Sequence, residues 1–237
     1  MHKQQQHVAD SLRRVQAFLD SHAAVLGPLN DTEARKQLDQ AVDRASTHAL
    51  GQLTAEREFA GAGNQVKSLA DDLKASHMTP VAMFARAKLR GVPDFKALAE
   101  VPRNLRGPRL VTAAHAMASA ATPYVDRLES AKFPGESVPQ LAAAAHALEA
   151  AFAERMAAGS RRVVATAGIR KELAVGREAV AMLDPIVAKR LAGKEELLAG
   201  WRSAKRITQR PQGNLVIAVV PPTPPTPPAS TPEVRAA

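Results

Sequence analysis

Clusters of arginine are the part of this sequence whose residue type and spacing could do chemistry. Two clusters provide six candidate residues, which are Arg103, Arg106, Arg109, Arg161, Arg162 and Arg170. Arginines that converge on one face can bind nucleic acid or another polyanion through its phosphates, with a strong dependence on salt. Segments 103–109 and 161–177 are therefore the candidate polyanion-binding segments.

The positive charge of the chain is concentrated around these segments. The formal net charge is +9, with seven basic and two acidic residues in 86–109 and twelve basic and five acidic residues in 161–210. However, no aromatic residues that could stack on bases alternate with the arginines, and no compact helix-turn-helix is evident. Basic side chains also keep helix surfaces hydrated and stabilise helix C-termini. Polyanion binding is therefore the alternative hypothesis, and a solvated helix surface is the simpler interpretation.

The histidines lack the spacing of a metal site in a helical bundle. A di-iron site uses Glu-x-x-His pairs. The residues three positions before the histidines are not acidic, and they are Gln4, Leu19, Ala45, Lys74, Thr112 and Ala143. No His-x-x-x-His lies on one helix face, and the chain contains no cysteine. We therefore predict no metal ligands and interpret His22 and His115 as hydrogen-bonded or solvent-edge side chains.

Motifs for cofactor binding and catalysis are absent as well. The sequence contains no Gly-x-x-x-x-Gly-Lys phosphate loop, no dinucleotide fingerprint after a strand and no Gly-x-Ser-x-Gly elbow. The acidic pairs Asp71–Asp72 and Glu195–Glu196 consist of adjacent residues, which point to different helix faces, whereas acid/base catalysis needs convergent groups. The sequence predicts no cofactor and no enzymatic activity.

The composition and the hydrophobic periodicity indicate an all-α protein. Hydrophobic residues make up 46% of the chain and aromatic residues only 3%, so that Ala, Leu and Val must form most of the core. Within 163–191, apolar residues alternate at spacings of four and three. They are Ile169, Leu173, Gly176, Val180, Leu183 and Val187. This stripe is typical of a helix that packs against other helices, and Gly176 would let a neighbour approach closely.

Similar stripes and turn residues define the other expected helices. We expect helices over 4–26, 32–76, 80–89, 110–128, 137–191 and 195–207. Asn30 is the expected N-cap of the second helix, and Gly61–Asn64 should weaken its centre. A slip in the stripe near Gly159–Ser160 predicts local unwinding of the longest helix. Short capped turns between long helices favour an antiparallel bundle of four main long helices plus one or two short ones.

The expected organisation is one helical-bundle domain over residues 1–210 and a Pro- and Thr-rich tail over 211–237. The tail contains PPTPPTPP, which is typical of polyproline II, and we expect it to be disordered. Residues 215–220 of the tail are six apolar residues in a row, unlike the Pro- and Thr-rich remainder. The N-terminus lacks the apolar region of a signal peptide, and no run approaches the ~18 apolar residues of a membrane span. We expect a cytoplasmic protein without membrane contact.

Four blocks of the sequence, which cover most of residues 8–210, resemble known sequences. They are HMTPVAMFARAKLRGVPDF, VPRNLRGPRLVTAAHAMASAATPY, GSRRVVATAGIRKELAVGREAVAMLD and LLAGWRSAKRI. They resemble a family of uncharacterised bacterial all-α hypothetical proteins with no assigned function. The resemblance implies a bacterial, helical protein and assigns no site residue.

In the absence of a catalytic motif, the leading hypothesis is a non-catalytic helical scaffold or protein-interaction protein. Its partner would be an unidentified protein or a second copy of the chain. The alternative hypothesis is a protein that binds nucleic acid or another polyanion through the six arginines.

Overall fold

The structure is all-helical, as the composition predicts. A computed structural model describes residues 2–101, 104–130 and 133–207, and these ranges contain no β-strand. The predicted tail over 211–237, with its apolar run 215–220, lies outside the described residues. Within the described ranges, no helix combines the length and the apolar character needed to cross a lipid bilayer.

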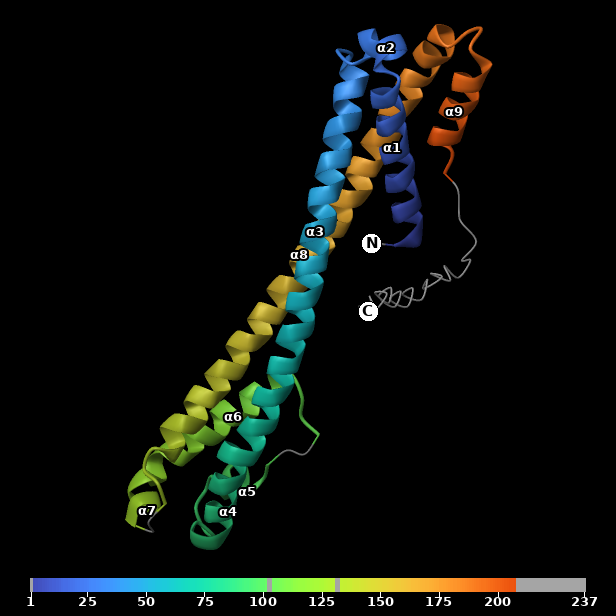
Figure 1. Ribbon diagram of the computed structural model, residues 1–237. Coiled ribbons are helices and arrows are strands. Elements are labelled where there is room, and N and C mark those ends of the chain that lie inside the picture. Colours follow the sequence, from blue (N-terminus) through green and yellow to red (C-terminus); the bar gives the residue numbers. More distant parts are fainter. Residues whose placement is uncertain (1, 102–103, 131–132, 208–237) are drawn as a thin grey trace, which may run out of the picture.

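Two long antiparallel helices, α3 (Glu33–Asp72) and α8 (Ser137–Arg190), run along the molecule (Figure 1). Polar contacts connect them at successive levels. Gln52 Nε2 donates to Thr166 Oγ1 at 3.0 Å, and Arg161 Nη2 lies 2.7 Å from Glu58 Oε2. At 1.5 Å per residue, α8 is about 80 Å long.

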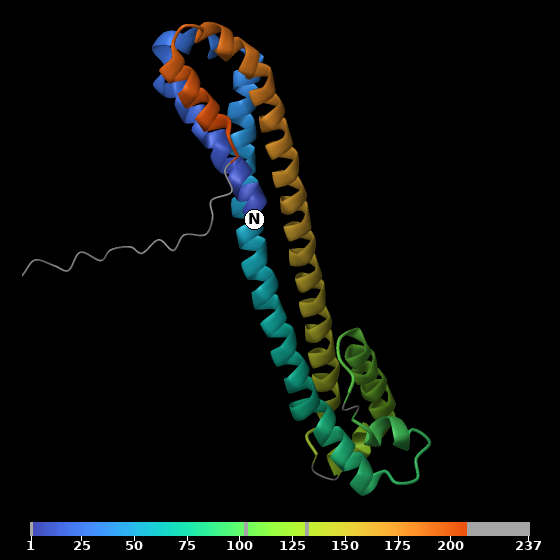
Figure 2. The ribbon, with the colours of Figure 1, turned by 90° about the vertical axis from the view of Figure 1, so that its right-hand side faces the viewer.

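One end of the long pair is covered by the first and last helices of the chain. They are α1 (Lys3–Ser21), α2 (Ala23–Leu26), the 3₁₀ turn Gly27–Leu29 and α9 (Glu195–Lys205) (Figures 1 and 2). With the start of α3 and the end of α8 they enclose one hydrophobic cluster, which includes Leu19, Leu38, Ile169, Leu183 and Trp201. The stripe predicted within 163–191 faces this cluster, and only its Val180 is partly exposed.

The opposite end is covered by the segments between the two long helices. They are the π-helical turn Leu73–Met78, α4 (Thr79–Lys88), α5 (Phe95–Ala99), α6 (Pro108–Ala121), the 3₁₀ turn Thr122–Tyr124 and α7 (Val125–Ser130). Their buried side chains form a second cluster with α3 and α8, which includes Leu73, Met78, Leu110, Met117 and Leu148. The two clusters therefore lie at opposite ends of the molecule (Figure 2).

The middle of the molecule consists of α3 and α8, and we call residues 49–63 and 153–167 the stem. Its buried contacts are made by small side chains, namely Ala55, Ala158 and Ala165. Gly159 lies beside the ring of Phe59, and a Cβ on the glycine would be 3.4 Å from this ring, at ordinary contact distance. Small residues let two helices approach closely, and the pair therefore buries a narrow stripe without a third helix.

This arrangement corrects the predicted bundle of four main long helices. Only α3 and α8 extend from one cluster to the other, whereas α1 and α6 accompany the pair at opposite ends (Figure 1). A stripe in the sequence shows that one face of a helix is buried, but it does not show which helix covers that face. The interpretation of residues 1–210 as one domain stays a prediction.

Three predictions about helix ends and breaks have different outcomes. Helix α3 continues through Gly61–Asn64, as predicted for a weak centre. The predicted unwinding at Gly159–Ser160 is wrong, because α8 is continuous there, in the middle of the stem. The predicted N-cap Asn30 is also wrong. Thr32 caps α3, and its Oγ1 accepts a hydrogen bond from the backbone N–H of Arg35 at 3.3 Å.

A network of polar contacts fastens α9 to α8 and α1. Trp201 Nε1 donates to Asp184 Oδ1 at 2.7 Å, and Lys205 Nζ lies 2.6 Å from both oxygens of the same carboxylate. Burial raises the pKa of Asp184, but the hydrogen bonds from Lys205 and Trp201 outweigh this effect and hold the pKa below its ordinary value. On the other side, Ser11 Oγ donates to the carbonyl of Lys205 at 3.1 Å.

Candidate functional site

Two of the six predicted arginines line one groove beside the N-terminal end of α1. The groove has a volume of about 570 Å³, and its lining includes Arg162, Arg170, His2 and Glu56. An adjoining groove of about 300 Å³ shares His2 and Arg170 and adds Arg177. Arg162, Arg170 and Arg177 are eight and seven residues apart, or about two helical turns each, and therefore lie on one side of α8. The structure thus brings together part of the second predicted segment.

The other predicted arginines that the structure describes do not line this groove. Arg161 is paired with Glu58 across the stem, so its charge is compensated. Arg106 and Arg109 are exposed, just before α6 and in its first turn. Arg103 lies outside the described residues. Of the predicted arginines in the described part of the chain, Arg162 and Arg170 of the second segment therefore line this concave surface.

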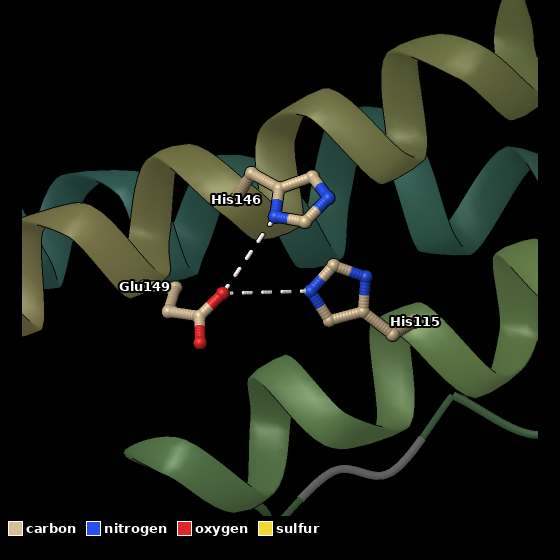
Figure 3. Close-up of side chains that lie close together, drawn as sticks. All are labelled: His115, His146 and Glu149. Carbon is tan, nitrogen blue, oxygen red and sulfur yellow. Dashed lines mark ion pairs between the residues drawn. The ribbon is translucent and has the colours of Figure 1, made fainter.

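A different group of side chains meets where α6 packs on α8. His115 comes from α6, and His146 and Glu149 come from α8 (Figure 3). Glu149 Oε2 lies 3.9 Å from His115 Nε2 and 3.6 Å from His146 Nδ1, and the centroids of the two imidazole rings are 4.5 Å apart. One nitrogen or oxygen atom of each residue lies within 4.8 Å of those of the other two. Of the side chains that the structure describes, these three form a group with the donor atoms of a metal site.

The sequence places two of these three residues at a spacing that brings them together, but not the third. His146 and Glu149 are three residues apart on one helix, but the histidine comes first, whereas the Glu-x-x-His pattern requires the reverse order. His115 is 31 positions away from His146, and only the packing of α6 on α8 brings the two rings together. The expectation of no metal ligand stays a prediction.

The outward side of α8 in the stem carries apolar and small residues instead of charged ones. We call these residues the α8 face, and they are Ala153, Met156, Ala157, Ser160, Val163, Val164 and Ala167. All seven are exposed, and the three large ones are exposed by 74% (Met156), 64% (Val163) and 68% (Val164). Their helical spacing puts them on the side of α8 opposite to Ala158 and Ala165, which are buried against α3.

Comparisons with known proteins do not place this chain in a family. No family model, no curated protein and no solved structure matches it. The resemblance of the four sequence blocks to bacterial helical proteins therefore stays a prediction, and the function has to be inferred from the geometry.

Proposed function

We propose that this protein is a non-catalytic helical scaffold that pairs with a second copy of itself through the α8 face. The observation that carries this proposal is a stripe of seven exposed, uncharged residues along one side of a long helix, six of which are apolar. The exposed charged residues of the same segment, Glu154, Arg161 and Arg162, lie outside this stripe. The water-exposed side of a helix normally carries charged and polar residues. A contiguous exposed apolar surface is typical of a site where another protein binds.

The α8 face is suited to pairing with another helix. Its positions follow the alternating three- and four-residue spacing that buried helix seams use. Four of them are small, namely Ala153, Ala157, Ser160 and Ala167, so a second helix can approach closely. The larger side chains, Met156, Val163 and Val164, provide apolar area that becomes buried in such a contact.

The charges that border the α8 face favour a second copy of this chain as the partner. Glu149 precedes the face and Lys171 follows it, and each lies 11 residues from Ser160. In an antiparallel pair of α8 helices centred on Ser160, Glu149 of each copy faces Lys171 of the other copy. A two-fold contact makes this pairing twice. Opposite charges at both borders therefore stabilise this register.

The oligomeric state of the full chain tests this proposal. Sedimentation equilibrium of the wild type should show dimers at micromolar concentration. The change Val164→Glu should weaken the dimer about 100-fold or more, because a carboxylate would be buried in the apolar contact. The matched control is Leu50→Glu on α3, where the replaced side chain is also 68% exposed, and it should leave the dimer unchanged. A wild type that remains monomeric at about 100 μM would refute the proposal.

Binding of a polyanion is the second candidate function, and the groove beside α1 favours it. Arg162, Arg170 and Arg177 line the two adjoining grooves together with His2, and Glu56 is the acidic residue in the lining. Three guanidinium groups along one side of a helix can contact successive anionic groups of an extended ligand. Val163 and Ala167 belong to both the groove lining and the α8 face, whereas the arginines lie outside the face, so a charge reversal at Arg170 tests polyanion binding separately from pairing.

A salt titration of binding to heparin and to a short single-stranded DNA tests the second candidate. Three phosphate contacts predict a slope of log K against log salt of about −2 for single strands. Arg170→Glu should reduce affinity at least about tenfold, since it removes one contact and adds a repulsive charge. Arg44→Glu on α3 is the control, because Arg44 is exposed and outside the groove. A slope near zero, or equal losses in both variants, would exclude this function.

A further inference from the structure

We propose that His115, His146 and Glu149 bind a divalent transition metal such as Zn²⁺ and thereby fasten α6 to α8. The three side chains offer two imidazole nitrogens and one carboxylate oxygen (Figure 3). This donor set suits zinc and other first-row transition metals, whereas calcium and magnesium prefer oxygen ligands. Three protein ligands leave a fourth position of a tetrahedral zinc ion open.

The positions of the ligands are fixed by the backbone, and only their side chains have to adjust. His146 and Glu149 lie three residues apart and therefore on the same face of α8. His115 follows Ala114, which is fully buried in the second hydrophobic cluster, so its backbone is held by packing. Metal–ligand bonds of 2.0–2.2 Å require donor atoms about 3.3 Å apart.

The required movement is small. Glu149 Oε2 is already 3.6 Å from His146 Nδ1 and 3.9 Å from His115 Nε2. The widest separation in the group is within 4.8 Å, so closure needs shifts of about 1 Å. The side chains of His146 and Glu149 are mostly exposed, which leaves them free to change rotamer.

The proposed metal site goes beyond the proposed pairing of two copies. Both histidine contacts are made by Oε2 of Glu149, so the other carboxylate oxygen is available to Lys171 of a second copy. The metal would join α6, which belongs to the second hydrophobic cluster, to the long helix α8. Its expected effect is stabilisation of the end of the molecule that contains α4 to α7.

Titration of the full chain with Zn²⁺, and with Co²⁺ as a spectroscopic probe, tests this inference. About 100 μM Zn²⁺ should raise the Tm of the wild type by about 5 °C, if the site binds in the micromolar range. One equivalent of Co²⁺ should produce the visible absorption of four- or five-coordinate Co²⁺ with nitrogen ligands. His115→Ala and His146→Ala should each abolish both signals, because two ligands hold the ion weakly.

The matched control is His77→Ala. His77 also faces a carboxylate, with Nε2 at 3.7 Å from Asp72 Oδ2, but it lies outside the proposed site. This variant should bind Zn²⁺ and Co²⁺ like the wild type, and so should Val164→Glu, whose pairing is disrupted. No stoichiometric binding by the wild type, or binding that survives His146→Ala, would overturn the assignment.

Discussion

Replacing Gly176 by leucine is expected to destabilise the protein by about 3 kcal/mol, because the site has no room for a side chain. A Cβ at this position of α8 would lie 2.6 Å from Cδ1 of Leu12 on α1 and 3.5 Å from the Cβ of Ala41 on α3. Three helices meet at this glycine. The larger side chain would push them apart and loosen the contacts of the first hydrophobic cluster, whose buried members are at most 9% exposed in the wild type.

Urea unfolding followed by circular dichroism measures this loss. The control is Gly61→Leu in α3, where a Cβ would have no neighbour within 4 Å. This control should be neutral or stabilising by up to about 1 kcal/mol, since leucine has a higher helix propensity than glycine. If both variants changed the free energy of unfolding equally, helix propensity alone would explain the result, and close packing at Gly176 would be refuted.

Replacing Trp201 by alanine is expected to release α9 from the molecule, with a local cost of about 3–5 kcal/mol. Trp201 is fully buried, its ring lies 5.7 Å from that of Phe18, and its Nε1 donates to Asp184. Removing it leaves a cavity between α9, α1 and α8. Because the two hydrophobic clusters are separated by the stem, the loss should be confined to one end.

Amide hydrogen exchange distinguishes a local from a global effect. Trp201→Ala should lower protection in α1 and α9 and leave protection in α4 and α6 unchanged. Trp201→Phe keeps an aromatic ring but removes the donor to Asp184 and part of the buried ring volume, so it should cost about 1–2 kcal/mol, less than Trp201→Ala. Equal loss of protection at both ends of the molecule would contradict the separation of the two clusters.

The helices were predictable because apolar periodicity records burial. The stripe of 163–191 is buried as predicted except for Val180, which is partly exposed, and Gly176 lies where a missing side chain permits close contact. The helix expected over 110–128 is interrupted at Pro123, which lies in a 3₁₀ turn after the end of α6 at Ala121, because proline lacks the N–H that would continue the helix. These features depend on local spacing and backbone chemistry, which a single sequence contains.

The arrangement of the helices was not predictable in the same way. The slip of the stripe at Gly159–Ser160 predicts a break, but these residues lie in the middle of the stem, between the parts of α8 that belong to the two hydrophobic clusters. In the stem, contacts through Ala55, Ala158 and Ala165 bury little area. Alanine is common on both buried and exposed helix faces, so its positions give a weak signal for pairing.

The candidate sites were predictable only in part. Arg162 and Arg170 line one groove because both lie on α8 at helical spacing, whereas Arg161 points to Glu58 across the stem. One residue of offset along a helix rotates a side chain by about 100° and changes its neighbours. The approach of His115 to His146 depends on tertiary packing between two helices, and no local pattern encodes it.

Pairing of two copies through the α8 face is the central claim, and disulfide cross-linking tests it most directly. The chain contains no cysteine, so Ser160→Cys would introduce its single thiol at the proposed centre of the contact. Mild oxidation should convert this variant to covalent dimers, because the two-fold arrangement brings the two thiols together. Ser68→Cys on α3, also exposed, should remain monomeric on denaturing gels. Failure of Ser160→Cys to cross-link, or equal cross-linking of both variants, would contradict the account.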